Sequence, residues 1–100
     1  MPKATCAVCV KFHIKPAHFA DFLAAVNTQA ANSKQLEPWC HQFDVSTLPD
    51  HPTAVLLYET YDDRAAFFEK HRTTAHFAAF SQMIAEWVES KEVGVWDIQP

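Results

Sequence analysis

The feature that most constrains this chain is a strand-like segment, residues 54–61, that is apolar on both of its faces. One face carries Val55, Leu57, Glu59 and Tyr61, and the other carries Ala54, Leu56, Tyr58 and Thr60. Successive side chains of a strand point to opposite faces of its sheet, and a strand that is apolar on both faces needs a covering layer on each side. The chain is therefore expected to form a sheet that lies between two layers.

Periodicity predicts three further strands and a first helix. Alternation with a period of two predicts strands over residues 4–14, 39–47 and 93–98. Pro16 suits the first turn of a helix, where its missing N–H group costs nothing. Apolar residues at three- and four-residue spacing then continue this helix, which must end before Pro38.

The second helical stretch is predicted in two pieces. Asp62 or Asp63 can cap a short helix over residues 64–71, and Thr73 or Thr74 can cap a longer one. The longer helix has an apolar stripe formed by Phe77, Phe80, Ile84, Trp87 and Val88. The order β-α-β-β-α-β predicts an α+β fold of the ferredoxin-like, split βαβ kind, in which a four-stranded antiparallel sheet carries its helices on one face.

The opposite face of that sheet still needs a cover. Leu56, Tyr58 and Trp96 would otherwise form a large apolar patch in contact with water. A second copy of the same sheet is the simplest cover. We therefore expect a homodimer in which the two sheets face each other.

Length and charge narrow the class of protein. One hundred residues fit a single domain, 1–100. The formal net charge is −4 and the eight Lys and Arg residues form no basic stripe, which argues against nucleic acid or an anionic membrane surface as a partner. No apolar run approaches the roughly 20 residues that span a bilayer. Residues 1–5 lack a signal-peptide pattern, so we expect a cytoplasmic protein.

The three cysteines and the single glycine limit the cofactor chemistry. Cys6 and Cys9 have CxxC spacing, but residues three apart in a strand point to opposite faces. They are expected, like Cys40, to be small buried thiols. One glycine is too few for a Gly-rich phosphate loop, and His71 and His76 are poorly spaced to share a metal ion across a helix break. We expect neither a metal nor a cofactor.

Three ionisable residues stand on otherwise apolar faces. Glu59 lies in the middle of the doubly apolar strand, His41 alternates with aromatic residues, and His71 follows Phe67 by four positions on a helix. If these faces meet, the three side chains converge in one aromatic cavity, where a carboxylate can orient an imidazole and stabilise its protonated form. The equally weighted alternative is a buried polar cluster that only ties a helix to the sheet.

The sequence resembles the antibiotic biosynthesis monooxygenase domain family from Val8 to Trp96. The matching segments are Lys15-Pro16, Glu37-Pro38-Trp39-Cys40-His41-Gln42-Phe43-Asp44-Val45, Leu57-Tyr58-Glu59-Thr60-Tyr61, and the run from Ala66 to Phe77. The last run is the most specific and resembles the family's His…Thr-Pro-His-Phe motif. Ala75 replaces the usual proline and Trp39 replaces a usual glycine.

The resemblance implies a dimeric α/β barrel with a pocket between sheet and helices in each subunit. It also implies cofactor-free oxygenation of quinols or anthrones, and the residues that resemble the quinol monooxygenase members are Cys40, His41, Glu59, His71 and His76. Haem-degrading members use a Trp and a ligating His where this chain aligns His71 and Ser81, so haem degradation is not expected. An isomerase member acts on a phosphorylated dione and needs a phosphate site, and this pocket is expected to offer little positive charge beyond Arg72.

The leading hypothesis is a monooxygenase whose partners are O₂ and a small quinol-like or polyketide-like aromatic. His71, oriented by Glu59, would remove a phenolic proton, and His41 would hydrogen-bond a substrate oxygen. The residues expected to contact the substrate are Phe43, Tyr61, Phe67, His76, Phe77 and Phe80. His76 lies in a first helical turn, where the helix dipole favours neutral imidazole, and a capping or surface role stays open for it. The alternatives are an isomerase of a small carbonyl compound and a non-catalytic binding dimer.

Overall fold

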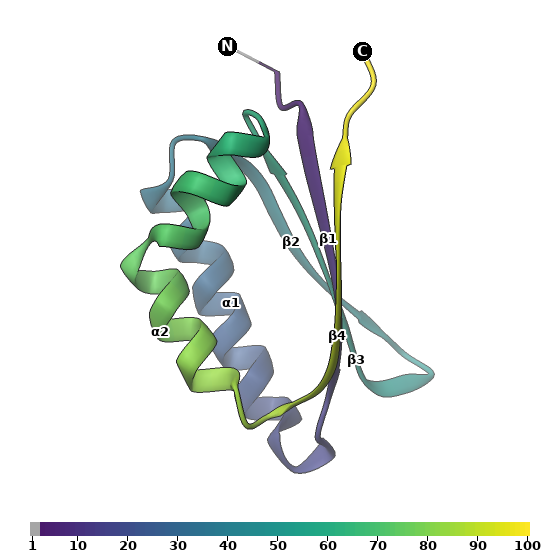
Figure 1. Cartoon of the computed structure of the whole chain (residues 1–100). Helices are drawn as coiled ribbons and strands as arrows, with labels where there is room; N and C mark the ends of the chain where they lie inside the picture. Colours follow the sequence, from purple (N-terminus) through teal and green to yellow (C-terminus); the bar gives the residue numbers. More distant parts are fainter. Residues whose placement is uncertain (1–2) are drawn as a thin grey trace.

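The computed structural model describes residues 3–100, and the elements follow the predicted order (Figure 1). Its strands are β1 (Cys6–Ile14), β2 (Cys40–Leu48), β3 (His51–Tyr61) and β4 (Val88–Asp97), and its α-helices are α1 (Phe19–Leu36) and α2 (Ala75–Ile84). Met1 and Pro2 lie outside the described residues. The expectations about a signal peptide and about a domain 1–100 include these two residues. Within residues 3–100, none of the helices combines the length and apolarity needed to cross a bilayer.

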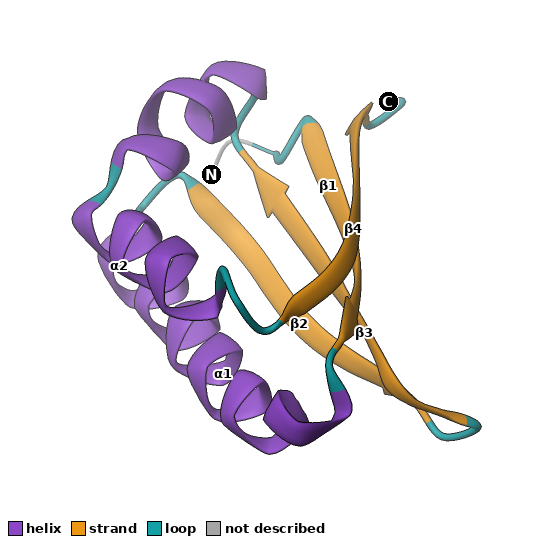
Figure 2. Cartoon of the chain, turned by 60° about the horizontal axis from the view of Figure 1, so that its bottom comes forward, coloured by secondary structure: helices purple, strands orange, loops and turns teal. Residues whose placement is uncertain are grey.

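The four strands form one antiparallel sheet in the order β2-β3-β1-β4, and the helices lie on one face of it (Figure 2). The two central strands are therefore β3 and β1, while β2 and β4 form the edges. This arrangement confirms the α+β ferredoxin-like fold predicted from the sequence.

The core lies between the central strands and α1. Phe12 of β1 and Phe22 of α1 are buried and meet edge to face, with their ring centroids 5.0 Å apart. Val26 and Val55 are also buried in this layer. Full burial of a side chain of this size stabilises the fold by roughly 1.5–3 kcal/mol relative to exposure, so this layer fixes where α1 lies on the sheet.

The structure corrects the boundary between the last helix and the last strand. The prediction that Trp87 and Val88 continue the helical stripe was wrong, because α2 ends at Ile84 and β4 begins at Val88. Val88 pairs with Ile14 of β1, and the Trp87 carbonyl accepts a hydrogen bond from the Lys15 amide at 2.9 Å. Trp87 and Val88 thus fit the apolar spacing of a helix but bond to β1 and the residue that follows it instead.

The segment between β3 and α2 is helical but irregular. Asp63 Oδ1 accepts a hydrogen bond from the Ala66 amide at 2.8 Å, which confirms the predicted cap. A π-helical turn, η2 (Ala66–Lys70), passes into a 3-10 turn, η3 (His71–Thr73). Thr74 Oγ1 then accepts from the Phe77 amide at 3.2 Å and caps α2 as predicted. His71 lies where the helix type changes, and its side chain is buried there.

The face of the sheet away from the helices is exposed and partly apolar. Leu56, Tyr58 and Trp96 are all more than a third exposed, and Trp96 reaches 63%. A Cβ atom on Gly94 would lie 2.7 Å from Trp96 Nε1, so the indole packs directly over the glycine backbone. Among residues 3–100, no second layer covers this face of the sheet.

Candidate active site

A cavity of about 240 Å³ opens between the helix-bearing face of the sheet and the segment that contains η2, η3 and α2. Its walls are mainly apolar and include six phenylalanines. Four of the six residues predicted to contact a substrate line it: Phe43, Phe67, Phe77 and Phe80. His71 and Glu59 also line it, so the structure brings together two of the three ionisable residues that the sequence singled out.

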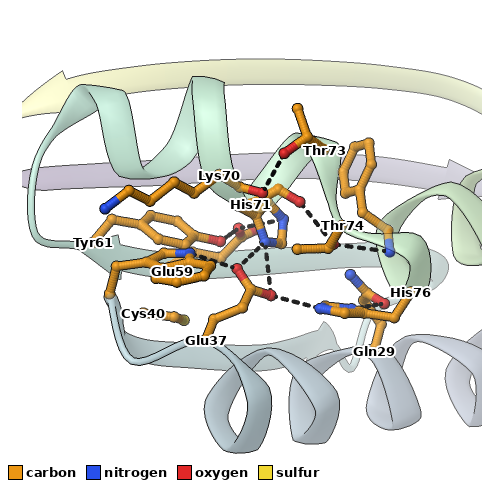
Figure 3. A network of polar contacts seen from close by, with 12 residues as sticks. Gln29, Glu37, Cys40, Glu59, Tyr61, Lys70, His71, Thr73, Thr74 and His76 are labelled. Carbon is orange, nitrogen blue, oxygen red and sulfur yellow. Dashed lines mark hydrogen bonds and ion pairs between the residues drawn. The ribbon is translucent and has the colours of Figure 1, made fainter.

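His71 is held in one orientation by contacts on all sides (Figure 3). It is 2% exposed, it stacks on Phe67 with ring centroids 5.6 Å apart, and it meets the edge of Phe77 at 5.1 Å. Nδ1 lies 2.8 Å and 3.1 Å from the two carboxylate oxygens of Glu37. Since a carboxylate only accepts, Nδ1 donates its proton to Glu37. When the ring is neutral, its Nε2 is therefore bare, and this atom lies 3.9 Å from Oε1 of Glu59.

Glu37 is the central residue that the sequence analysis missed. It follows the last residue of α1 and is 1% exposed. Burial alone would raise the pKa of Glu37, but the hydrogen bond and the charge of His71, with a hydrogen bond from Trp39 Nε1, hold that pKa below its ordinary value. Glu37, and not Glu59 as expected, therefore bears the charge that orients His71.

Glu59 is a second buried carboxyl group with the opposite behaviour. It is 2% exposed, and burial raises its pKa to about 7, although the hydrogen bond from Tyr61 and the charge of His71 oppose the shift. The Tyr61 hydroxyl donates to Oε1 at 2.5 Å. Burial and the neighbouring Glu59 carboxylate raise the pKa of Tyr61, which keeps it a phenol donor. Glu59 can thus exchange a proton near neutral pH.

The structure does not bring His41 into the cavity. Its side chain is 26% exposed, and Nε2 lies 2.6 Å from Oδ1 of Asp62. The pairing of β2 with β3 is irregular between Cys40 and Gln42, so the alternation that placed His41 on the same face as Phe43 is broken there. The expectation that His41 faces the site was wrong for this reason.

Two predicted substrate contacts lie behind the cavity wall. Tyr61 contacts Glu59 but is not part of the lining. His76 lies on the far side of Glu37, in a groove between α1 and α2. Its Nε2 is 2.9 Å from Oε2 of Glu37 without the alignment of a hydrogen bond, and its Nδ1 is 3.1 Å from Oε1 of Gln29. Glu37 therefore lies between two imidazoles (Figure 3).

The thiols and potential metal ligands offer no competing centre among residues 3–100. Cys6, Cys9 and Cys40 are free, and no three or more His, Cys, Asp or Glu side chains are grouped to hold a metal ion. Burial raises the pKa of Cys40 to about 12, with further contributions from Glu37 and Glu59, so it stays a thiol. The ionisable chemistry of this cavity rests on His71 and Glu59, supported by Glu37.

The model of the antibiotic biosynthesis monooxygenase family matches residues 5–83. The chain belongs to this family. That match covers β1 through most of α2, including Glu37, Glu59 and His71. No curated protein matches the chain.

Solved structures agree with this assignment. A candidate antibiotic biosynthesis monooxygenase from Nitrosomonas europaea is 25% identical, with a TM-score of 0.87 over 95% of this chain and 99% of the other. Similar candidates from Bacteroides thetaiotaomicron and Caulobacter crescentus are 22% and 19% identical, with TM-scores of 0.86 and 0.90. The alignments cover 100% and 99% of this chain and 92% and 93% of the others. These two likenesses establish the fold.

Replacing Glu37 by Gln should lower the free energy of unfolding by about 2–3 kcal/mol at neutral pH, because His71 loses a buried charged acceptor. The pKa of Glu37 is lowered by folding, so this stabilisation is present above its unfolded pKa and is lost as pH falls through the folded value. Urea titrations at several pH values measure it. Asp50→Asn, in the exposed β2–β3 turn, is the control and should change stability by less than about 0.5 kcal/mol. Equal stability of Glu37→Gln and wild type would contradict this assignment.

Replacing Glu59 by Gln should stabilise the protein at about pH 8.5 and have little effect at about pH 4. The pKa of Glu59 is raised by folding from 4.5 to about 7, so the penalty for ionising it grows as pH rises between these values. A shift of this size corresponds to about 3 kcal/mol. Urea titrations of both proteins across this range test the prediction, with Glu92→Gln on exposed β4 as the control. A Glu59→Gln variant that is less stable than wild type at about pH 8.5 would overturn it.

Proposed function

We propose that the protein is a cofactor-independent monooxygenase that oxygenates a small, electron-rich aromatic, such as a hydroquinone, with O₂. The observation that carries the proposal is the buried His71, whose Nδ1 is held by Glu37 and whose Nε2 is directed toward the side of the cavity that holds Glu59. Membership of the antibiotic biosynthesis monooxygenase family supports an oxygenase in particular.

The first step of the proposed reaction is removal of a phenolic proton. His71 Nε2 accepts the proton, and the Glu37 carboxylate stabilises the imidazolium that forms. The aromatic walls exclude water from the aryl oxide anion, so its negative charge is not quenched by solvation. The anion is consequently a strong one-electron donor.

The second step joins oxygen to the ring. The anion gives one electron to O₂, and the resulting superoxide and aryloxyl radical combine in a new C–O bond. Imidazolium returns its proton to the peroxide. The ring carbon then loses its hydrogen as a proton and the O–O bond breaks, so that hydroquinone and O₂ give a hydroxyquinone and water. Glu59, with a pKa of about 7, can donate a proton to the departing oxygen.

Gln29 replaces His41 as the donor to a second substrate oxygen in this proposal. Gln29 lines the cavity and is buried, and its Nε2 has no hydrogen-bond partner among the described residues. A buried amide donor without a partner is costly. A dihydroxylated ring offers an acceptor at this position while its other oxygen faces His71.

The substitution His71→Asn should reduce oxygen uptake with a panel of hydroquinones by at least about 100-fold, because the base is lost. An oxygen electrode measures the rates, and His41→Asn, outside the cavity, should retain wild-type activity. Unchanged oxygen uptake in His71→Asn would overturn the mechanism. Turnover of a carbonyl substrate without oxygen uptake would instead indicate an isomerase.

We also propose that two chains pair through the exposed sheet face. Leu56, Tyr58 and Trp96 give this face its apolar character, and burying it supplies the missing layer over β1 and β3. The dimeric α/β barrel that characterises the family is consistent with such pairing.

Light scattering coupled to size exclusion should give the mass of a dimer at micromolar concentration. Tyr58→Glu should give a monomer, because it places a charge in the centre of the apolar face. Leu36→Glu, at the exposed end of α1, should leave the dimer intact. A wild-type protein that is monomeric at this concentration would contradict the proposal.

A further inference from the structure

The cavity carries positive charge on its lining in addition to its acid–base groups. Arg72 and Lys91 both line the cavity and are exposed to solvent. Phe68 and Val93, which are also exposed, lie among the lining residues. These exposed lining residues come from the η2–η3 segment and from β4, which forms one edge of the sheet (Figure 2).

Lys91 comes from the sheet. It pairs with Phe12 in the β1–β4 register, so its side chain projects from the same face of the sheet as Phe12, the face that the helices cover. Nζ lies 5.7 Å from the centroid of the Phe12 ring. Its positive charge lowers the pKa of Glu59, against the larger opposing effect of burial. A cation from this strand was not expected from the sequence.

Arg72 comes from the helical side, directly after His71. Its Cζ lies 5.8 Å from the centroid of Phe68. Arg64 lies against the same ring, but it forms an ion pair with Asp97. In residues 3–100, neither Arg72 nor Lys91 has a carboxylate oxygen within 4.0 Å of its side-chain nitrogens. In a chain with 12 acidic and eight basic residues, two exposed cations on the lining of one cavity, neither of them paired with a carboxylate among residues 3–100, can attract an anion.

We propose that the aromatic substrate carries an acid group, which Arg72 and Lys91 bind on the cavity lining while the oxygen-bearing ring lies beside His71. This inference rests on the proposed function and deepens it by naming the substrate class. A cavity of about 150 Å³ accommodates benzene, so about 240 Å³ is enough for a substituted ring. Arg72 can bind a carboxylate or phosphate through two parallel hydrogen bonds, and Lys91 adds a second charge.

The test compares three ligands by calorimetry without oxygen, so that no turnover occurs: gentisate, which is a hydroquinone carboxylate, its neutral methyl ester, and a dihydroxyphenylphosphonate. Wild type should bind at least one acid about tenfold or more tightly than the ester. The tighter of the two acids identifies the group as carboxylate or phosphate. Equal affinity for acids and ester, or no binding of any of the three, would overturn the inference.

Arg72→Gln/Lys91→Gln should abolish the preference for the acid and leave binding of the ester unchanged. Lys11→Gln/Lys70→Gln is the matched control, because it removes the same charge outside the cavity lining and should retain the preference. A preference that persists in the first double variant would refute the inference. A preference for the acid without oxygen uptake would support the anion site and refute the proposed oxygenase activity. Oxygen uptake without a preference for the acid would support the oxygenase activity and refute the anion site.

Discussion

The hydrogen bond between Glu37 and His71 is the interaction on which the rest of the site depends. It joins the end of α1 to η3 across 34 residues, and both side chains are almost fully buried. A buried carboxylate is costly unless it is paired, so the fold must hold the imidazole against it. This pairing fixes which nitrogen of His71 carries the proton and directs the other nitrogen toward Glu59.

The two buried carboxyl groups acquire different properties from their surroundings. Glu37 accepts from His71 and Trp39, and its pKa is lowered; Glu59 accepts from Tyr61 and lies farther from His71, and burial raises its pKa to about 7. One carboxylate is thus suited to hold a permanent charge and the other to exchange a proton. Such a separation of pKa values is how one site supplies both a base and an acid near neutral pH.

The fold was predictable because its signals are local: period-two alternation, capping residues and helical spacing each require only a few neighbouring positions. His71 and Glu59 were found because ionisable groups on apolar faces are conspicuous. The position of His41 was not predictable, because the irregular pairing after Cys40 depends on β3. Glu37 was missed because it lies beyond the last turn of α1, and only its contact with the distant His71 reveals that it is buried.

The most direct test of this account is the protonation state of the His71 ring, measured by nitrogen NMR on protein labelled in its histidines. The His71→Asn variant assigns the signals. At a pH where the ring is neutral, Nδ1 should be protonated and Nε2 bare, and Nδ1 should lose its hydrogen-bonded shift in Glu37→Ala, which removes the acceptor. A bare Nδ1 in the wild-type protein would contradict it, because Glu37 could not then orient His71 as a base.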